Sequence, residues 1–175
     1  MQRKIITSTK LHSGVVFDVV HDRIREDSGS EYSREVVMHS GGTGGVALLE
    51  DGKIVLVRQY RHPAKKELLE IPAGKIDGDE TPEICAAREI EEELGLRAGK
   101  MRKLTEFYST PGFCAEKLYL YLATELQPTQ QNLDHDEQVE LVYVTLDEAL
   151  LMVSSGEIED AKTIIALLLV KQIYG

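Results

Sequence analysis

Residues 74–96 of this 175-residue chain read GKIDGDETPEICAAREIEEELGL, and the stretch predicts an α-helix over residues 82–94. Thr81 can cap the helix, because its side-chain oxygen can accept a hydrogen bond from the first turn. Pro82 suits the first helical position, where its missing N–H costs no hydrogen bond. Gly95 suits the left-handed residue that commonly ends a helix. Both ends of this helix are therefore marked by local sequence.

Glutamates crowd the second half of the predicted helix: Glu89, Glu91, Glu92 and Glu93. Spacings of three and four bring Glu89, Glu92 and Glu93 to one side. A neighbouring stripe is apolar and can face a core: Ala87, Ile90 and Leu94. Each like-charged pair costs roughly 0.2–0.5 kcal/mol, which a bound dication would relieve. Carboxylates without nearby Cys or His favour Mg²⁺ or Mn²⁺, although many acidic helix faces are merely solvated.

The same residues fit every position of the Nudix box, G-x5-E-x7-R-E-U-x-E-E-x-G-U, where U is aliphatic. The chain therefore resembles the Nudix hydrolases. The resemblance implies an α+β fold, namely an α/β/α sandwich with a mixed sheet. It also implies an enzyme that hydrolyses nucleoside diphosphates linked to another group. It assigns metal binding to Glu89, Glu93 and the Ala73 carbonyl. It also implies that Glu92 and Arg88 assist catalysis, and that Arg88 and Glu80 orient the carboxylates.

Two further stretches resemble the ADP-ribose pyrophosphatase branch of that family. They are residues 58–61 (RQYR) with the following 67–74 (ELLEIPAG), and Pro111, sixteen residues after Gly95. The branch implies hydrolysis of ADP-ribose to AMP and ribose 5-phosphate. Its substrate-binding candidates in this sequence are Arg34, Arg58, Arg61, Glu70 and Glu116. Arg61 is the best phosphate ligand, because a guanidinium fork matches phosphate oxygens. Surface charge at a strand end is the alternative for both strand arginines.

An acidic segment, residues 134–137 (DHDE), precedes a predicted strand. In the resembled branch the catalytic base often comes from a mobile acidic loop outside the box. The resemblance therefore points to Glu137 as the base or an additional metal ligand, with Asp136 as the alternative. A solvated acidic loop would have the same composition. For His39, near the N-terminal strands, a structural role is the simpler interpretation.

The chain is expected to divide into a β element, residues 1–42, and a Nudix domain, residues 43–175. Residues 15–20 and 34–38 are strand-like and flank a turn at 27–30, which predicts an antiparallel hairpin. A lone hairpin is marginal in water, so it must pack on the main body or on a second subunit. In the resembled branch such strands are exchanged within a homodimer. Residues 40–45 (SGGTGG) are expected to form a flexible joint.

The remaining elements follow from periodicity and turn signals. Strands are expected at residues 46–49, 54–57, 67–71, 117–123 and 141–144, and helices at 146–154 and 160–173. Asp51 and Gly52 predict a tight turn between the first two of these strands. Residues 126–138 are polar, lack periodicity and are expected to be a loop.

Bulk properties exclude several classes of protein. A net charge of −10 with no Lys/Arg-rich run argues against nucleic-acid binding. Two cysteines make no disulfide framework, and the longest apolar run, residues 164–170, is too short to cross a bilayer. The expected setting is cytoplasmic, and the expected partner is a small nucleoside diphosphate sugar. Open alternatives are another substrate such as ADP-glucose or GDP-mannose, a non-catalytic nucleotide sensor, and an acidic cation-binding module.

Overall fold

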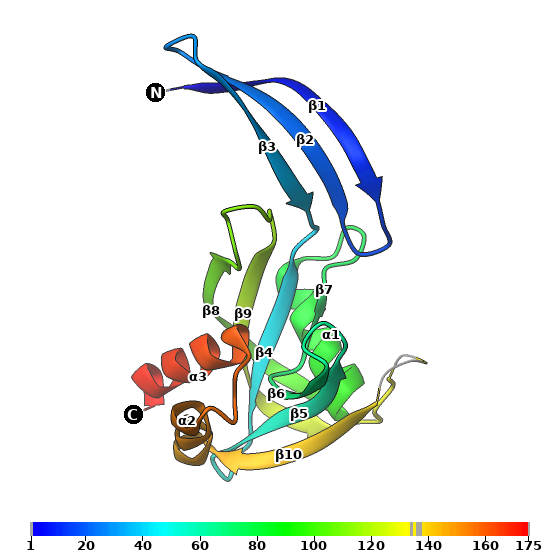
Figure 1. Ribbon diagram of the computed structural model, residues 1–175. Helices are drawn as coiled ribbons and strands as arrows, with labels where there is room; N and C mark the ends of the chain where they lie inside the picture. The colour runs from blue at the N-terminus through cyan, green and yellow to red at the C-terminus, as the bar shows by residue number, and fades with distance from the viewer. Residues whose placement is uncertain (1, 134, 136–137, 175) are drawn as a thin grey trace. The chain divides into compact units, whose positions relative to one another are not determined.

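The computed structural model describes residues 2–133, 135 and 138–174 (Figure 1). Its contacts group into two compact units. The first contains residues 2–41 together with Phe107–Lys117, and the second contains Gly42–Glu106 with residues 118–174.

The first unit is an antiparallel sheet in the order β1-β2-β3. Its strands are β1 (Arg3–Ser13), β2 (Asp18–Glu26) and β3 (Glu31–Met38). The predicted hairpin is β2 and β3, joined by a turn in which Gly29 has a φ of +87°. The sequence predicted only this hairpin, whereas the sheet has a third strand, β1. The polar sequence of β1 is exposed at ten of its eleven positions and carries little apolar alternation.

The second unit has a mixed sheet with the order β10-β5-β4-β9-β8. Its strands are β4 (Gly42–Leu48), β5 (Lys53–Arg61), β6 (Lys66–Glu70), β7 (Ala73–Lys75), β8 (Leu96–Tyr108), β9 (Lys117–Pro128) and β10 (Val139–Thr145). β4 pairs in parallel with β9 and antiparallel with β5 and β7. β6 pairs with β5. The mixed sheet that the family resemblance implies is confirmed.

Helices cover both faces of that sheet (Figure 1). They are α1 (Pro82–Leu94), α2 (Leu146–Ser155) and α3 (Ala161–Tyr174). Val55 and Val57 of β5 share a buried cluster with Ile90 of α1. Side chains alternate along a strand, so the fully buried Ile54 and Leu56 face the opposite layer. No helix among the described residues is long and apolar enough to span a membrane.

Helix α1 has the bounds that its sequence predicts. Thr81 Oγ1 accepts a hydrogen bond from the Ile84 N–H at 3.3 Å. At the other end Gly95 has a φ of 65°, and its N–H donates to the Glu91 carbonyl. The caps therefore fix where the glutamates lie along the helix axis.

The glycine-rich joint expected at residues 40–45 is wrong, because residues 42–45 belong to the buried strand β4. A Cβ on Gly45 would lie 2.5 Å from Cδ1 of Ile90, and one on Gly44 would lie 2.9 Å from Cδ1 of Ile71. These glycines let α1 and the β6–β7 connection approach the sheet closely. Here glycine marks tight packing and not freedom of the backbone.

The other elements agree with the sequence within a few residues, with three exceptions. The tight turn at Asp51 and Gly52 is confirmed, since β4 and β5 pair across it. The sequence predicted neither β7 nor β8. β9 continues to Pro128, so the loop expected from residue 126 begins later.

Candidate active site

Two carboxylates of α1 fold back onto the short strand β7. Glu93 is 2% exposed, and its Oε1 accepts a hydrogen bond from the Ala73 N–H at 3.4 Å. Glu89 lies against the next residue: a Cβ on Gly74 would be 1.9 Å from Oε1 of Glu89. Glycine is therefore required at position 74, because any side chain there would overlap the Glu89 carboxylate. The helix and the strand therefore gather oxygen atoms around residues 73 and 74.

Arg88 organises the carboxylates on its side of the helix. Its Nη1 lies 2.8 Å from Oε1 of Glu89 and 2.8 Å from Oε2 of Glu92. Its Nη2 donates to Oε1 of Glu80 at 2.9 Å. The hydrogen bonds from Arg88 lower the pKa of Glu80 to about 2, and the same contacts raise the pKa of Arg88. Both ends of the pair stay charged, so Arg88 holds the acidic side chains together.

The oxygen atoms around residues 73 and 74 suit a hard dication. Glu89, Glu93 and the Ala73 carbonyl offer only oxygen, which Mg²⁺ and Mn²⁺ prefer. Within the described residues, no three acidic, histidine or cysteine side chains form a ready-made ligand cluster. The protein would therefore supply two carboxylates and a backbone carbonyl. Glu91 is turned elsewhere, because its Oε1 accepts from Nη2 of Arg97 at 2.7 Å.

Arg61 lies within electrostatic reach of Glu93. It donates two hydrogen bonds to Glu70, from Nε to Oε1 at 2.7 Å and from Nη2 to Oε2 at 2.8 Å. These bonds raise the pKa of Arg61, and the nearby charges of Glu93 and Asp160 raise it further. The Arg61 side chain is 40% exposed, whereas Glu70 is 1% exposed. Arg61 is thus accessible to a substrate, and the buried Glu70 holds the Arg61 guanidinium in position.

Arg58 points the other way. It lies three positions before Arg61 on β5, an odd spacing that puts the two side chains on opposite faces. Its Nε lies 3.5 Å from Oε2 of Glu140, and its Nη2 lies 4.0 Å from Oε1 of Glu157. Within this unit the structure therefore separates two arginines that the branch resemblance assigns to one substrate site.

The other substrate candidates, Arg34 and Glu116, lie in the first unit. The Arg34 guanidinium stacks over the Tyr32 ring at 4.6 Å. Glu116 Oε1 lies 3.8 Å from Nδ1 of His39, and that nitrogen accepts from the Gly41 N–H at 3.0 Å. The bond to Gly41 supports the structural interpretation of His39.

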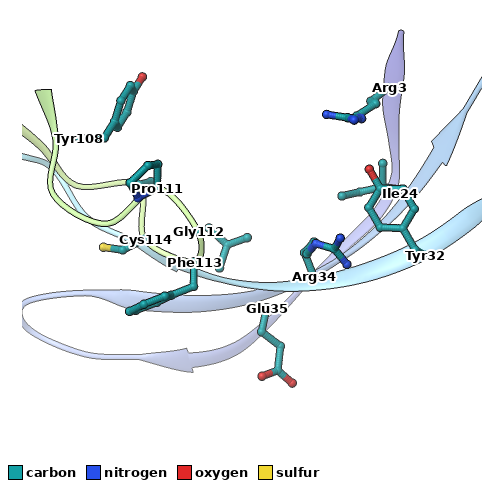
Figure 2. A pocket seen from close by; sticks show the side chains of 12 residues that line it. Arg3, Ile24, Tyr32, Arg34, Glu35, Tyr108, Pro111, Gly112, Phe113 and Cys114 are labelled. Carbon is teal, nitrogen blue, oxygen red and sulfur yellow. The ribbon is translucent and has the colours of Figure 1, made fainter. Parts of the chain in front are cut away.

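Arg34 also lines a pocket of about 470 Å³ inside the first unit (Figure 2). The three-stranded sheet contributes Tyr32, Arg3, Ile24, Glu35 and Val36 to its walls. The end of β8 and the segment after it contribute Tyr108, Pro111, Gly112, Phe113, Cys114 and Ala115. Two backbone hydrogen bonds join the segment to β3: the Val37 N–H donates to the Phe113 carbonyl, and the Ala115 N–H donates to the Val37 carbonyl. The branch resemblance points to Pro111, but no motif in the sequence singles out the aromatic side chains of Tyr108 and Phe113.

The predicted base Glu137 and its alternative Asp136 lie outside the described residues. The segment that leads toward them is attached to the end of α1. The Thr129 N–H donates to the Gly95 carbonyl at 2.7 Å, and the Asn132 N–H donates to the Glu92 carbonyl at 2.9 Å. Nε2 of Gln131 donates to the Glu93 carbonyl at 2.6 Å. These bonds satisfy carbonyls that a helix end leaves open, and nothing in the sequence pattern predicted them.

Known proteins resemble this chain in sequence and in fold. Residues 38–167 match the family model for the NUDIX domain. The chain is 41% identical over 169 residues to an ADP-ribose pyrophosphatase of Bacillus subtilis, and the aligned region covers 95% of this chain and 91% of that protein. It is 40% identical over 167 residues to a methanol dehydrogenase activator of Bacillus methanolicus, covering 94% and 90%. A crystal structure of an ADP compounds hydrolase superposes with a TM-score of 0.86 at 21% identity, covering 99% of this chain and 94% of that one, which confirms the fold.

Proposed function

Because the chain belongs to the NUDIX family, we propose that this pyrophosphohydrolase converts ADP-ribose and water to AMP and ribose 5-phosphate with a divalent cation. The observation that carries the proposal is the pair of carboxylates, Glu89 and Glu93, folded against Ala73 and Gly74. The similarity to the ADP-ribose pyrophosphatase of Bacillus subtilis supports the choice of substrate.

The residues divide the work as follows. Glu89, Glu93 and the Ala73 carbonyl would hold Mg²⁺ or Mn²⁺, whose chemistry is to neutralise a diphosphate and make water more acidic. Arg61 uses Nε and Nη2 on Glu70, and within the described part of the chain Nη1 has no hydrogen bond, so it can donate to a phosphate oxygen. Arg88 keeps Glu92 and Glu89 oriented. The proton of the attacking water goes to Glu137, a role that rests on the family resemblance.

Arg34 and Glu116 are the candidates of the first unit for binding the nucleoside. The pocket beside Arg34 offers the rings of Tyr32, Tyr108 and Phe113. Aromatic rings and a guanidinium are suitable surfaces for stacking a flat base. We therefore assign base binding to this pocket. Arg58 remains a weaker candidate, because its contacts are with Glu140 and Glu157.

A substrate panel tests the activity. With Mg²⁺ we expect kcat/KM for ADP-ribose to exceed that for ADP-glucose and GDP-mannose by at least about tenfold, because a site built for one polar group rejects analogues that leave its donors unpaired. Titration with Mg²⁺ and with Mn²⁺, and removal of both by EDTA, identifies the ion. A higher kcat/KM for another sugar nucleotide would move the assignment to that substrate. If none of these substrates is hydrolysed, the alternative of a non-catalytic nucleotide sensor would replace the proposed activity.

We also propose that the chain forms a homodimer through its first unit. Several large apolar side chains of this unit are exposed: Ile5, Leu11, Val15, Val16, Phe17 and Met38. Val15 is 95% exposed, and β1 is open to solvent along nearly its whole length. A small sheet that buries so little surface needs a partner. A second copy of the chain, contributing Arg34 to its neighbour's site, is that partner.

Light scattering after gel filtration tests the dimer. The wild-type protein should have the mass of two 19.6 kDa chains. The double substitution Val15→Asp, Phe17→Asp should give monomers, because charges on the pairing surface are costly to desolvate. Leu151→Asp is the matched control, since Leu151 is 70% exposed on α2, and it should leave the mass unchanged. A monomeric wild-type protein would contradict the proposal.

The setting that we propose is the reducing cytoplasm. Cys85 and Cys114 are both free thiols. Disulfides are rare in that compartment, so two unpaired cysteines are consistent with it.

A further inference from the structure

The N-terminus of α3 is fastened to the strand end that leads into the active site. Lys162 is largely covered, its side chain being 11% exposed, and its Nζ donates to Oε2 of Glu70. The same Nζ lies 3.1 Å from Oδ2 of Asp160. Neither the Nudix box nor the branch-specific stretches contain Lys162, and the proposed function gives it no role.

The next residue of α3 binds the next residue of the strand end. Oγ1 of Thr163 accepts a hydrogen bond from the Ile71 N–H at 2.9 Å and donates to Oδ2 of Asp160 at 2.6 Å. Two consecutive helix residues therefore hold Glu70 and Ile71, which directly precede Pro72 and Ala73. This attachment fixes the backbone that carries the proposed metal-binding carbonyl.

The charges around Glu70 show what Lys162 adds. Burial raises the pKa of Glu70, but the hydrogen bonds from Arg61 and Lys162 outweigh burial and hold the pKa below its usual range. Glu70 is therefore an anion shared by two cations. Without Lys162, the buried anion would rest on Arg61 alone, and Asp160 would lose its cation. The site would then present one more negative charge to a diphosphate, and Arg61 would be drawn inward.

We propose that Lys162 is a positioning residue for the anionic substrate: by holding Oε2 of Glu70, it sets the orientation of the Arg61 guanidinium and keeps that guanidinium available to a phosphate oxygen. The inference rests on the proposed hydrolysis of a nucleoside diphosphate. It adds a residue that contacts no substrate and that lies 92 positions from Glu70 in the sequence.

The test compares Lys162→Met with Lys171→Met. Lys171 is on the same helix, but its Nζ pairs with Asp147 at the surface, 3.1 Å away. For Lys162→Met, KM for ADP-ribose should rise roughly tenfold and kcat should change much less, because loss of one partner in a buried charge cluster weakens binding. The Kd of the α,β-methylene analogue of ADP-ribose, measured by calorimetry, should rise by the same factor. Lys171→Met should match the wild type in both.

A double-mutant cycle separates electrostatic positioning from simple packing. Adding Glu70→Gln to Lys162→Met removes the unbalanced anion, so KM and Kd should fall back toward the wild-type values. Purely additive effects of the two substitutions would overturn the proposal, because loss of the packed lysine stem does not depend on the charge of Glu70.

The remaining outcomes are also decisive. If Lys162→Met does not fold, Lys162→Gln takes its place, since its amide can still donate to Glu70 without carrying a charge. Wild-type KM and Kd in the folded variant would overturn the role of Lys162. If the wild-type enzyme itself neither hydrolyses nor binds a nucleoside diphosphate sugar, it is the proposed function that fails.

Discussion

Replacing Glu93 with glutamine should lower kcat/KM for ADP-ribose by about a thousandfold or more, the several kcal/mol that a catalytic metal supplies. Glutamine has nearly the same volume, and its amide can still accept the hydrogen bond from the Ala73 N–H. It lacks the negative charge that a hard dication requires of its ligand. Since Glu93 is 2% exposed, solvent offers no replacement nearby. Initial rates at saturating Mg²⁺ measure the effect.

The fold should survive this substitution, because a neutral amide costs less to bury than a carboxylate. Circular dichroism and the thermal midpoint check this point. Glu91→Gln is the matched control on the same helix, since that carboxylate pairs with Arg97 away from the cluster. It should keep wild-type turnover. Wild-type activity in Glu93→Gln would remove this residue from the metal site.

The second large effect is expected from Gly74→Ala. The new Cβ would lie 1.9 Å from Oε1 of Glu89, so the carboxylate has to leave its position. We expect kcat/KM to fall by about a hundredfold, in line with the cost of misplacing a group at the reaction centre. Stability should change little, because the atoms displaced are the end of a flexible side chain. Parallel measurements of the rate and the thermal midpoint separate the two effects.

Shortening the displaced side chain provides a check on the cause. Glu89→Asp alone should impair the enzyme, because its carboxylate falls short of Gly74. Combined with Gly74→Ala, it should cost less than the product of the two single effects, since the shorter side chain makes room for the methyl group. Full activity of Gly74→Ala would mean that Glu89 does not work from the position described.

The parts of the site that could be predicted are those written in local sequence. The bounds of α1 follow from Thr81, Pro82 and Gly95, whose effects act within one helical turn. Helical spacing alone brings Arg88 next to Glu92. The separation of Arg58 from Arg61 could also have been predicted, because an odd spacing on a strand changes the face.

Two of the features that escaped prediction depend on distant partners, and a third lacks a sequence signal. The glycines of β4 looked like a joint, because close packing against Ile90 and backbone freedom select the same residue type. Strand β1 escaped because it is exposed on both faces and has no apolar alternation. Lys162 meets Glu70 only through the fold, and no short spacing could have revealed that contact.

The central claim is that Glu89 and Glu93 bind a dication that a nucleoside diphosphate sugar shares. Anomalous diffraction from crystals grown with Mn²⁺ and the α,β-methylene analogue of ADP-ribose tests it most directly. We expect a manganese peak coordinated by both carboxylates, by the Ala73 carbonyl and by the diphosphate of the analogue. An analogue bound elsewhere, with no metal peak at these carboxylates, would contradict the claim.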